Sequence, residues 1–190
     1  GGVNRITTLT TPLSSSATGG TLNITGKAGL EITQDIQLNS NAVITVNAST
    51  NTGGVDLSFT GGKVNFTGGK GDDSIGFEFD QFDDKSIVDG GDGKDTLRLT
   101  GGNINATTPA ALAAINGVEK VEVLGFGKQN NVVSEVTVDA TKITAVKEYD
   151  FVADTVNLSG AATANKLTLY KTTNNHNVGL NLTGKGHSVD

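Results

Sequence analysis

Residues 68–98 of the chain read GGKGDDSIGFEFDQFDDKSIVDGGDGKDTLR and contain two copies of one nonapeptide. GGKGDDSIG occupies residues 68–76 and GGDGKDTLR occupies residues 90–98, and in each copy a loop half rich in Gly and Asp precedes a short strand half. Glycine lets the backbone adopt left-handed conformations and point its carbonyls at a common centre. An Asp at the sixth place adds a hard anionic oxygen, so the pattern predicts a small Ca²⁺ cage.

Acidic residues are concentrated in the same stretch. Residues 72–95 hold nine Asp and Glu against two Lys, a net charge of −7, whereas the whole chain of 190 residues carries −6. The rest of the chain is therefore close to neutral. Mutual repulsion within so local a block favours a bound cation.

A five-residue phrase of the form apolar, polar, apolar, Ser or Thr, Gly recurs along the chain. It begins at Leu22, Leu57, Val64, Leu97, Val156 and Leu180, and a variant begins at Val121. Side chains at positions i and i+2 of a strand point to one face, and the glycine then turns the chain. One such strand cannot bury itself, so we expect the copies to stack as an all-β, parallel β-solenoid. A β-sandwich is the alternative.

One segment interrupts the strand pattern. Thr108 precedes Pro109, a run of strong helix formers follows, and Gly117 stands where a C-terminal cap belongs. We therefore predict a short helix over residues 109–116, with Leu112 and Ile115 either against the sheet or covering an edge of the solenoid.

The length of the chain suffices for one domain with a buried core. We expect residues 1–20, which end in SSSATGG, to form a flexible entry segment or a weak edge strand. Residues 21–190 are predicted to form a single β-solenoid domain.

Composition excludes several classes of function. The chain has no Cys and no Met, so neither a disulfide nor a thiolate metal site can form. An acidic sequence pI of about 4.8 and the lack of a basic patch argue against nucleic acid as a partner, and the apolar runs are too short for membrane insertion. The only two histidines, His176 and His187, lie in no catalytic motif, so we expect no enzymatic activity.

The two nonapeptides resemble the GGxGxDxUx repeat of RTX proteins, in which U is a large apolar residue, here Ile75 and Leu97. In that family the first six residues form a Ca²⁺-binding turn and the last three form a strand. Asp73 and Asp95 are 22 residues apart, four more than two regular nonapeptides would give. The turn between the two copies is therefore expanded.

The resemblance implies that Asp73 and Asp95, sixth in their motifs, are carboxylate ligands of Ca²⁺. The backbone carbonyls implied to complete the site belong to Gly69, Lys70, Gly71, Asp72, Gly91, Asp92, Gly93 and Lys94. The candidate ligands of a second ion lie in the expanded turn and are Asp80, Asp83, Asp84 and Asp89.

A motif pair, then a strand, then a small helix ending in the phrase NGVEKVEV at 116–123, then further strands, is similar to RTX-containing bacterial S-layer proteins exported by type I secretion. The resemblance implies an extracellular structural domain on the bacterial cell surface that folds and self-assembles with Ca²⁺. Its implied partners are copies of itself in a two-dimensional lattice, and cell-surface polysaccharide. The alternatives are an RTX adhesin domain that binds a glycan or host surface, and a carrier module of an exported enzyme.

Overall fold

Parallel β-strands make up the protein. The computed structural model describes residues 2–7, 19–78, 81, 86–100, 115–124, 135–140, 146–152, 155–160, 166–169 and 179–183. These residues form 17 β-strands, no α-helix occurs among them, and every strand pair they make is parallel. The prediction of an all-β protein with parallel sheets is confirmed. The β-sandwich alternative is wrong for the described strands, because sandwiches are built from antiparallel pairs.

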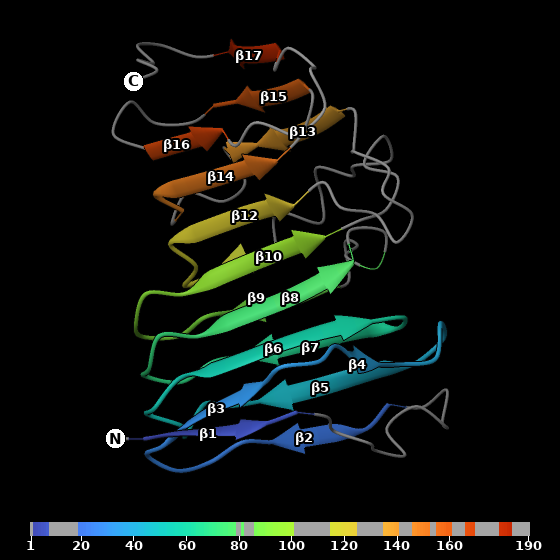
Figure 1. Cartoon of the computed structure of the whole chain (residues 1–190), viewed down its shortest axis with the longest axis vertical. Helices are drawn as coiled ribbons and strands as arrows, with labels where there is room; N and C mark the ends of the chain where they lie inside the picture. Colours follow the sequence, from blue (N-terminus) through green and yellow to red (C-terminus); the bar gives the residue numbers. More distant parts are fainter. Residues whose placement is uncertain are drawn as a thin grey trace.

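The strands form three sheets, and within each sheet the strands are stacked along the long axis of the molecule (Figure 1). The first sheet runs in the order β1 (Val3–Ile6), β3 (Gly29–Ile32), β6 (Val55–Thr60), β8 (Ser74–Glu78), β10 (Thr96–Thr100), β12 (Lys120–Leu124), β14 (Glu148–Val152) and β16 (Lys166–Leu169), with β4 (Ile36–Gln37) also paired to β6. The second sheet contains β2 (Thr21–Asn23), β5 (Val43–Asn47), β7 (Lys63–Thr67), β9 (Val88–Asp89) and β11 (Ile115–Asn116). The third contains β13 (Glu135–Asp139), β15 (Thr155–Ser159) and β17 (Gly179–Thr183).

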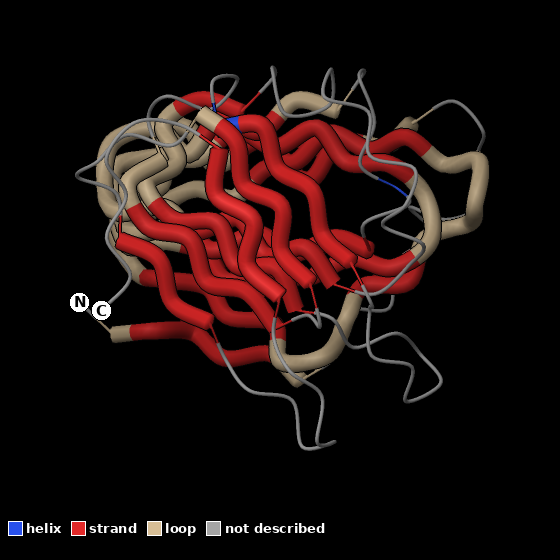
Figure 2. Tube along the Cα trace, turned by 90° about the horizontal axis from the view of Figure 1, so that it is seen from above, coloured by secondary structure: helices blue, strands red, loops and turns tan. Residues whose placement is uncertain are grey.

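The chain alternates between the first sheet and one of the other two along its length. Each visit to the first sheet adds one strand in parallel beside the previous visit, apart from the short β4. We call one such circuit of the chain a coil. Seen along the stack (Figure 2), strands lie on opposite sides of the core and are joined at the two ends by turns. This arrangement is compatible with a β-solenoid.

The core lies between the sheets and is filled by apolar side chains that alternate along the strands, those of the recurring phrase among them. Leu57, Ile75 and Leu97 are register partners on three adjacent strands, and each is at most 2% exposed. The rings of Phe59 and Phe77 stack in the next row, with centroids 6.3 Å apart. Alternate residues of β5, β7 and β10 are buried in the same way. The side-chain period of two thus determines which face of each strand enters the core.

Every copy of the phrase begins within a strand. The seven strands are β2, β6, β7, β10, β12, β15 and β17. Register partners on neighbouring strands are 18 residues apart between Leu57 and Ile75 but 28 apart between Val121 and Tyr149. The strands therefore keep a common register, and the turns absorb the irregular spacing of the sequence.

The predicted helix over residues 109–116 is wrong at its C-terminal end. Ile115 and Asn116 form β11, which pairs in parallel with Val88 and Asp89 of β9, and Ile115 is buried. Strand pairing with the edge of β9 and burial of the Ile115 side chain stabilise the strand more than the local helix propensity favours a helix. Residues 109–114 lie outside the described residues.

The first part of residues 1–20 contains one strand, β1. β1 pairs with β3 at the edge of the first sheet, and all four of its residues are exposed. Residues 8–18 lie outside the described residues.

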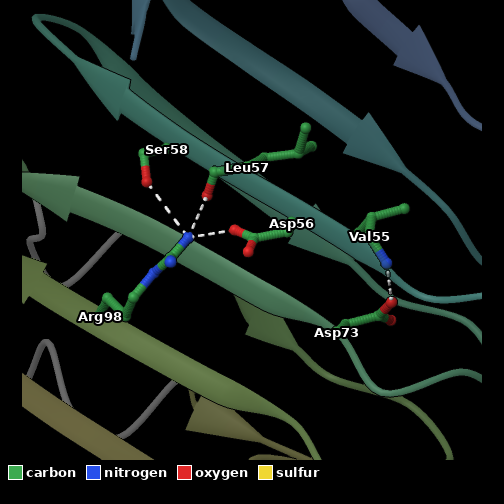
Figure 3. A network of polar contacts seen from close by, with 6 residues as sticks. All are labelled: Val55, Asp56, Leu57, Ser58, Asp73 and Arg98. Atoms are coloured by element: carbon green, nitrogen blue, oxygen red, sulfur yellow. Dashed lines mark hydrogen bonds and ion pairs between the residues drawn. The ribbon is translucent and has the colours of Figure 1, made fainter. Parts of the chain in front are cut away.

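One side chain on the outer face of the first sheet connects three strands. Arg98 on β10 reaches across β8, and its Nη2 atom donates hydrogen bonds to Asp56 Oδ1 and Ser58 Oγ on β6 (Figure 3). The same atom lies 3.4 Å from the carbonyl oxygen of Leu57. Arg98 is paired in register with Gly76, where a β-carbon would lie 2.6 Å from Ser58 Oγ. The missing side chain at Gly76 therefore leaves the path of the guanidinium open.

Replacement of Arg98 by Met should lower the free energy of unfolding by about 1–2 kcal/mol, because three acceptors on β6 lose their shared donor. Urea unfolding at fixed Ca²⁺ concentration measures the change. Arg5→Met is the matched control, since Arg5 pairs only with the neighbouring strand through Glu31 and is more exposed. Equal losses for the two variants would contradict a connecting role for Arg98.

Candidate metal site

The two motif turns lie directly on top of one another at one corner of the stack. Residues 68–73 connect β7 to β8, and residues 90–95 connect β9 to β10. Strands β8 and β10 pair in parallel with Ser74 opposite Thr96, a shift of 22 residues. The sequence separation of Asp73 and Asp95 is therefore one full coil, and their backbones are neighbours.

A ladder of carboxylates links the coils at this corner. Asp73 Oδ1 accepts a hydrogen bond of 2.8 Å from the backbone N–H of Val55 in the preceding coil. Asp95 Oδ1 accepts one of 2.7 Å from the N–H of Asp73. Glu119 Oε2 accepts one of 2.8 Å from the N–H of Asp95. Each acidic side chain thus binds the backbone of the coil before its own.

The first glycine of each motif makes room for these carboxylates. A β-carbon on Gly68 would lie 2.3 Å from Asp73 Oδ2 and 2.0 Å from the carbonyl oxygen of Gly90. A β-carbon on Gly90 would lie 2.5 Å from Asp95 Oδ2 and 2.2 Å from the carbonyl oxygen of Gly117. A carboxylate oxygen and a carbonyl oxygen of the following coil therefore converge beside each of these glycines, where any other residue would collide with them.

Asp73 and Asp95 differ in how their second oxygen is satisfied. Asp73 Oδ2 accepts a hydrogen bond of 2.9 Å from the N–H of Gly69, so both of its oxygens have donors. Asp95 is only 2% exposed, and its Oδ2 atom has no hydrogen-bond partner among the described residues. A buried anionic oxygen without a donor costs free energy, and a cation is one group that removes this cost.

Burial raises the pKa of both aspartates. For Asp73, the N–H groups of Gly69 and Val55 oppose the effect of burial, and the pKa still lies above its ordinary value. For Asp95, burial raises the pKa from 3.8 to about 7, helped by the nearby carboxylates of Asp73 and Glu119. Asp95 is thus the acidic group at this corner whose charge the surroundings stabilise least.

The remaining motif residues hold the two turns together. Asp72 Oδ1 accepts a hydrogen bond of 3.0 Å from the N–H of Lys94, and the carbonyl of Gly69 accepts one of 2.9 Å from the N–H of Asp92. Gly93 has a φ of 141°, which favours glycine. The side chains of Lys70 and Lys94 are exposed, as are those of Asp72 and Asp92.

The structure brings most of the predicted site residues to this corner. They are Gly69, Lys70, Gly71, Asp72, Asp73, Gly91, Asp92, Gly93, Lys94 and Asp95, together with Asp89 at the end of β9. Three others, Asp80, Asp83 and Asp84, lie outside the described residues.

The donor set consists of oxygen atoms. Within the described ranges, no group of three or more His, Cys, Asp and Glu side chains is arranged to hold a metal ion. A site at this corner therefore relies on one or two carboxylates plus backbone carbonyls. Carboxylate and carbonyl oxygens suit Ca²⁺, so the residues present fit this ion.

Glu119 was not predicted as a site residue, although the sequence contains a signal for it. Asp73 and Asp95 stand two residues before the first inward apolar residue of their strands, Ile75 and Leu97. Glu119 stands two residues before Val121 in the same way. Its position relative to the strand, and not the nonapeptide, identifies it as the third member of the ladder.

Comparisons with known protein families, with curated proteins and with solved structures found no match to this chain. In the described part of the chain, no helix has the length and apolar character needed to cross a membrane.

The raised pKa of Asp95 predicts a pH dependence of stability in the presence of a chelator. Between pH 4 and pH 7 the folded state holds a proton on Asp95 that the unfolded state has released, so stability should fall as the pH rises through this range. The loss should be on the order of 2–4 kcal/mol, at about 1.4 kcal/mol per pKa unit. Chemical denaturation at a series of pH values in EDTA measures it.

Asp95→Asn should flatten this pH dependence, because the amide oxygen can still accept the N–H of Asp73 and the charge is gone. Asp92→Asn removes an exposed carboxylate of the same turn and should leave the dependence unchanged. A wild-type profile that rises between pH 4 and pH 7 in EDTA would contradict the assignment.

Proposed function

We propose that the chain is a non-enzymatic, Ca²⁺-binding β-solenoid domain of the RTX type from a secreted bacterial surface-layer protein. The observation that supports this most is the buried Asp95 Oδ2, which has no donor in the described part of the chain and lies in a stack of two glycine-aspartate turns. The alternation of the chain between parallel sheets agrees with the proposed solenoid.

The chemistry of the corner favours Ca²⁺ over other common ions. Asp73 and Asp95 supply the carboxylates, and the motif turns supply backbone carbonyls, so every available ligand is a hard oxygen. The chain has no Cys, which excludes thiolate coordination of zinc or iron. Flexible coordination by six to eight oxygens of mixed origin is typical of Ca²⁺, whereas Mg²⁺ demands a near-ideal octahedron.

Ion binding would be coupled to folding. The net charge of −7 over residues 72–95 opposes close stacking of the turns until a cation compensates it. Because the ligands come together only when the coils stack, the binding free energy contributes directly to folding. A domain of this kind would stay loosely structured at low Ca²⁺ and become ordered at the millimolar concentrations outside the cell, which agrees with type I secretion.

The proposed cellular role is assembly. A stack with Ca²⁺-stabilised corners forms a rigid body whose outer faces contact further copies in a two-dimensional lattice and bind cell-surface polysaccharide. Function as an adhesin that binds a glycan or host surface, or as a carrier module, would use the same Ca²⁺-dependent fold without a lattice.

Addition of EDTA should reduce the β-sheet signal in circular dichroism, and millimolar Ca²⁺ should restore it and raise the melting temperature. Mg²⁺ at the same concentration serves as the control for general screening of the acidic residues. Identical spectra and melting temperatures with EDTA and with Ca²⁺ would contradict the proposed calcium dependence.

Electron microscopy after addition of Ca²⁺ should show two-dimensional sheets or ordered oligomers, and EDTA should dissolve them. A protein that folds with Ca²⁺ but remains monomeric in light scattering, while binding to a glycan array, would replace the lattice role by that of an adhesin.

A further inference from the structure

The corner contains two intervals of the same construction. The lower interval lies between the turns 68–73 and 90–95, and the upper interval lies between the turns 90–95 and 117–119. In the lower interval, Asp73 Oδ2 and the carbonyl oxygen of Gly90 converge beside Gly68. In the upper interval, Asp95 Oδ2 and the carbonyl oxygen of Gly117 converge beside Gly90.

The two intervals differ in one backbone donor. In the first motif, the N–H of Gly69 donates to Asp73 Oδ2 at 2.9 Å. The equivalent N–H in the second motif belongs to Gly91, which has a φ of 89° and donates to Asp89 Oδ1 at 3.2 Å. This N–H group therefore donates to a different carboxylate, and the buried Asp95 Oδ2 has no donor within the described ranges.

A second carboxylate reaches the same interval from the next coil. Glu119 Oε2 lies 2.8 Å from the backbone nitrogen of Asp95, and its charge contributes to the electrostatic environment of the Asp95 carboxyl group. Lys120, which follows Glu119 in the sequence, does not neutralise the carboxylates of Asp95 and Glu119. Its Nζ atom lies 2.7 Å from both Glu122 Oε1 and Asp150 Oδ2. Within the described residues, neither Asp95 nor Glu119 forms an ion pair.

We propose that the upper interval binds a Ca²⁺ ion through the carboxylates of Asp95 and Glu119 and the carbonyl oxygen of Gly117. Two of these three ligands lie outside both nonapeptides, so the ion extends the site by one coil beyond the repeat. This inference rests on the proposed function, since it assumes that Ca²⁺ is the ion bound at this corner. Two anionic oxygens and one carbonyl leave further coordination positions for water.

Isothermal titration of the chain with CaCl₂ tests this assignment. Glu119→Gln should remove one ion from the stoichiometry or weaken its affinity at least tenfold, and Asp95→Asn should do the same. Each variant retains an oxygen that can accept the N–H of the preceding coil, so the ladder is preserved. Asp35→Asn is the matched control and should bind as the wild type does, because it removes an exposed carboxylate that lies between β3 and β4, outside this corner.

Melting temperatures in EDTA and in Ca²⁺ separate a ligand from a purely structural residue. Glu119→Gln should leave the melting temperature in EDTA unchanged or raised, because a like charge beside Asp95 is removed, while the increase caused by Ca²⁺ becomes smaller. Asp73→Asn should lower the melting temperature in EDTA, because both Asp73 oxygens accept N–H groups, yet it should still bind the upper ion.

Two results would overturn the assignment while leaving the proposed function intact. One is loss of all Ca²⁺ binding in Asp73→Asn with wild-type binding in Glu119→Gln, which would place the ion in the lower interval alone. The other is a lowered melting temperature of Glu119→Gln in EDTA with an unchanged increase on addition of Ca²⁺. Absence of any Ca²⁺ binding by the wild-type chain would overturn the proposed function as well.

Discussion

The hydrogen bond from a backbone N–H to a carboxylate of the following coil is the contact on which this corner depends. At the corner the chain leaves one sheet and enters another, so the regular ladder of backbone hydrogen bonds is interrupted. Without the carboxylates of the following coil, the N–H groups of Val55, Asp73 and Asp95 would be buried without acceptors. A hydrogen bond to a charged acceptor contributes roughly 1.5–3 kcal/mol, and leaving a buried donor unpaired costs a similar amount. The acidic residue before each of these strands therefore aligns consecutive coils.

The same contact creates an electrostatic conflict. The carboxylates of Asp73, Asp95 and Glu119, in three consecutive coils, place negative charges above one another at the spacing of adjacent strands, and burial reduces their screening by water. Asp73 offsets part of this cost with two N–H donors, whereas Asp95 has one. Stacking of the coils and neutralisation of the corner are thus linked, which is the physical basis for connecting the fold to a bound cation.

On the outer face of the first sheet, a contact made by the second nonapeptide requires a glycine of the first. They differ at the ninth position, which is Gly76 in the first copy and Arg98 in the second, and these residues are register partners. The absence of a side chain at Gly76 opens the path along which Arg98 reaches β6. A glycine that looks like a turn residue in the sequence therefore serves a contact between strands.

Much of the strand pattern could be predicted from residues close in the chain, because alternation of side chains is a local property of a strand. The seven phrases, the alternating buried face of strands such as β5, β7 and β10, and the two glycine-aspartate turns belong to this class. The prediction of a helix at residues 109–116 was wrong at Ile115 and Asn116. These two residues pair with the edge of β9, and local helix propensity takes no account of such a distant strand. Glu119 was missed because it lies outside the nonapeptide and becomes part of the corner only when β12 stacks on β10.

The amino-acid sequence by itself determined the strands that contain the recurring phrase, which of their faces are apolar, and where glycine and aspartate build a turn. Only the tertiary structure decided which turns are neighbours, because register is set by hydrogen bonds between coils whose lengths differ. Stacking places Asp73, Asp95 and Glu119 in one ladder although different numbers of residues separate them. The N–H of Gly91 donates to Asp89, so that one buried oxygen of Asp95 has no donor among the residues that the structure describes.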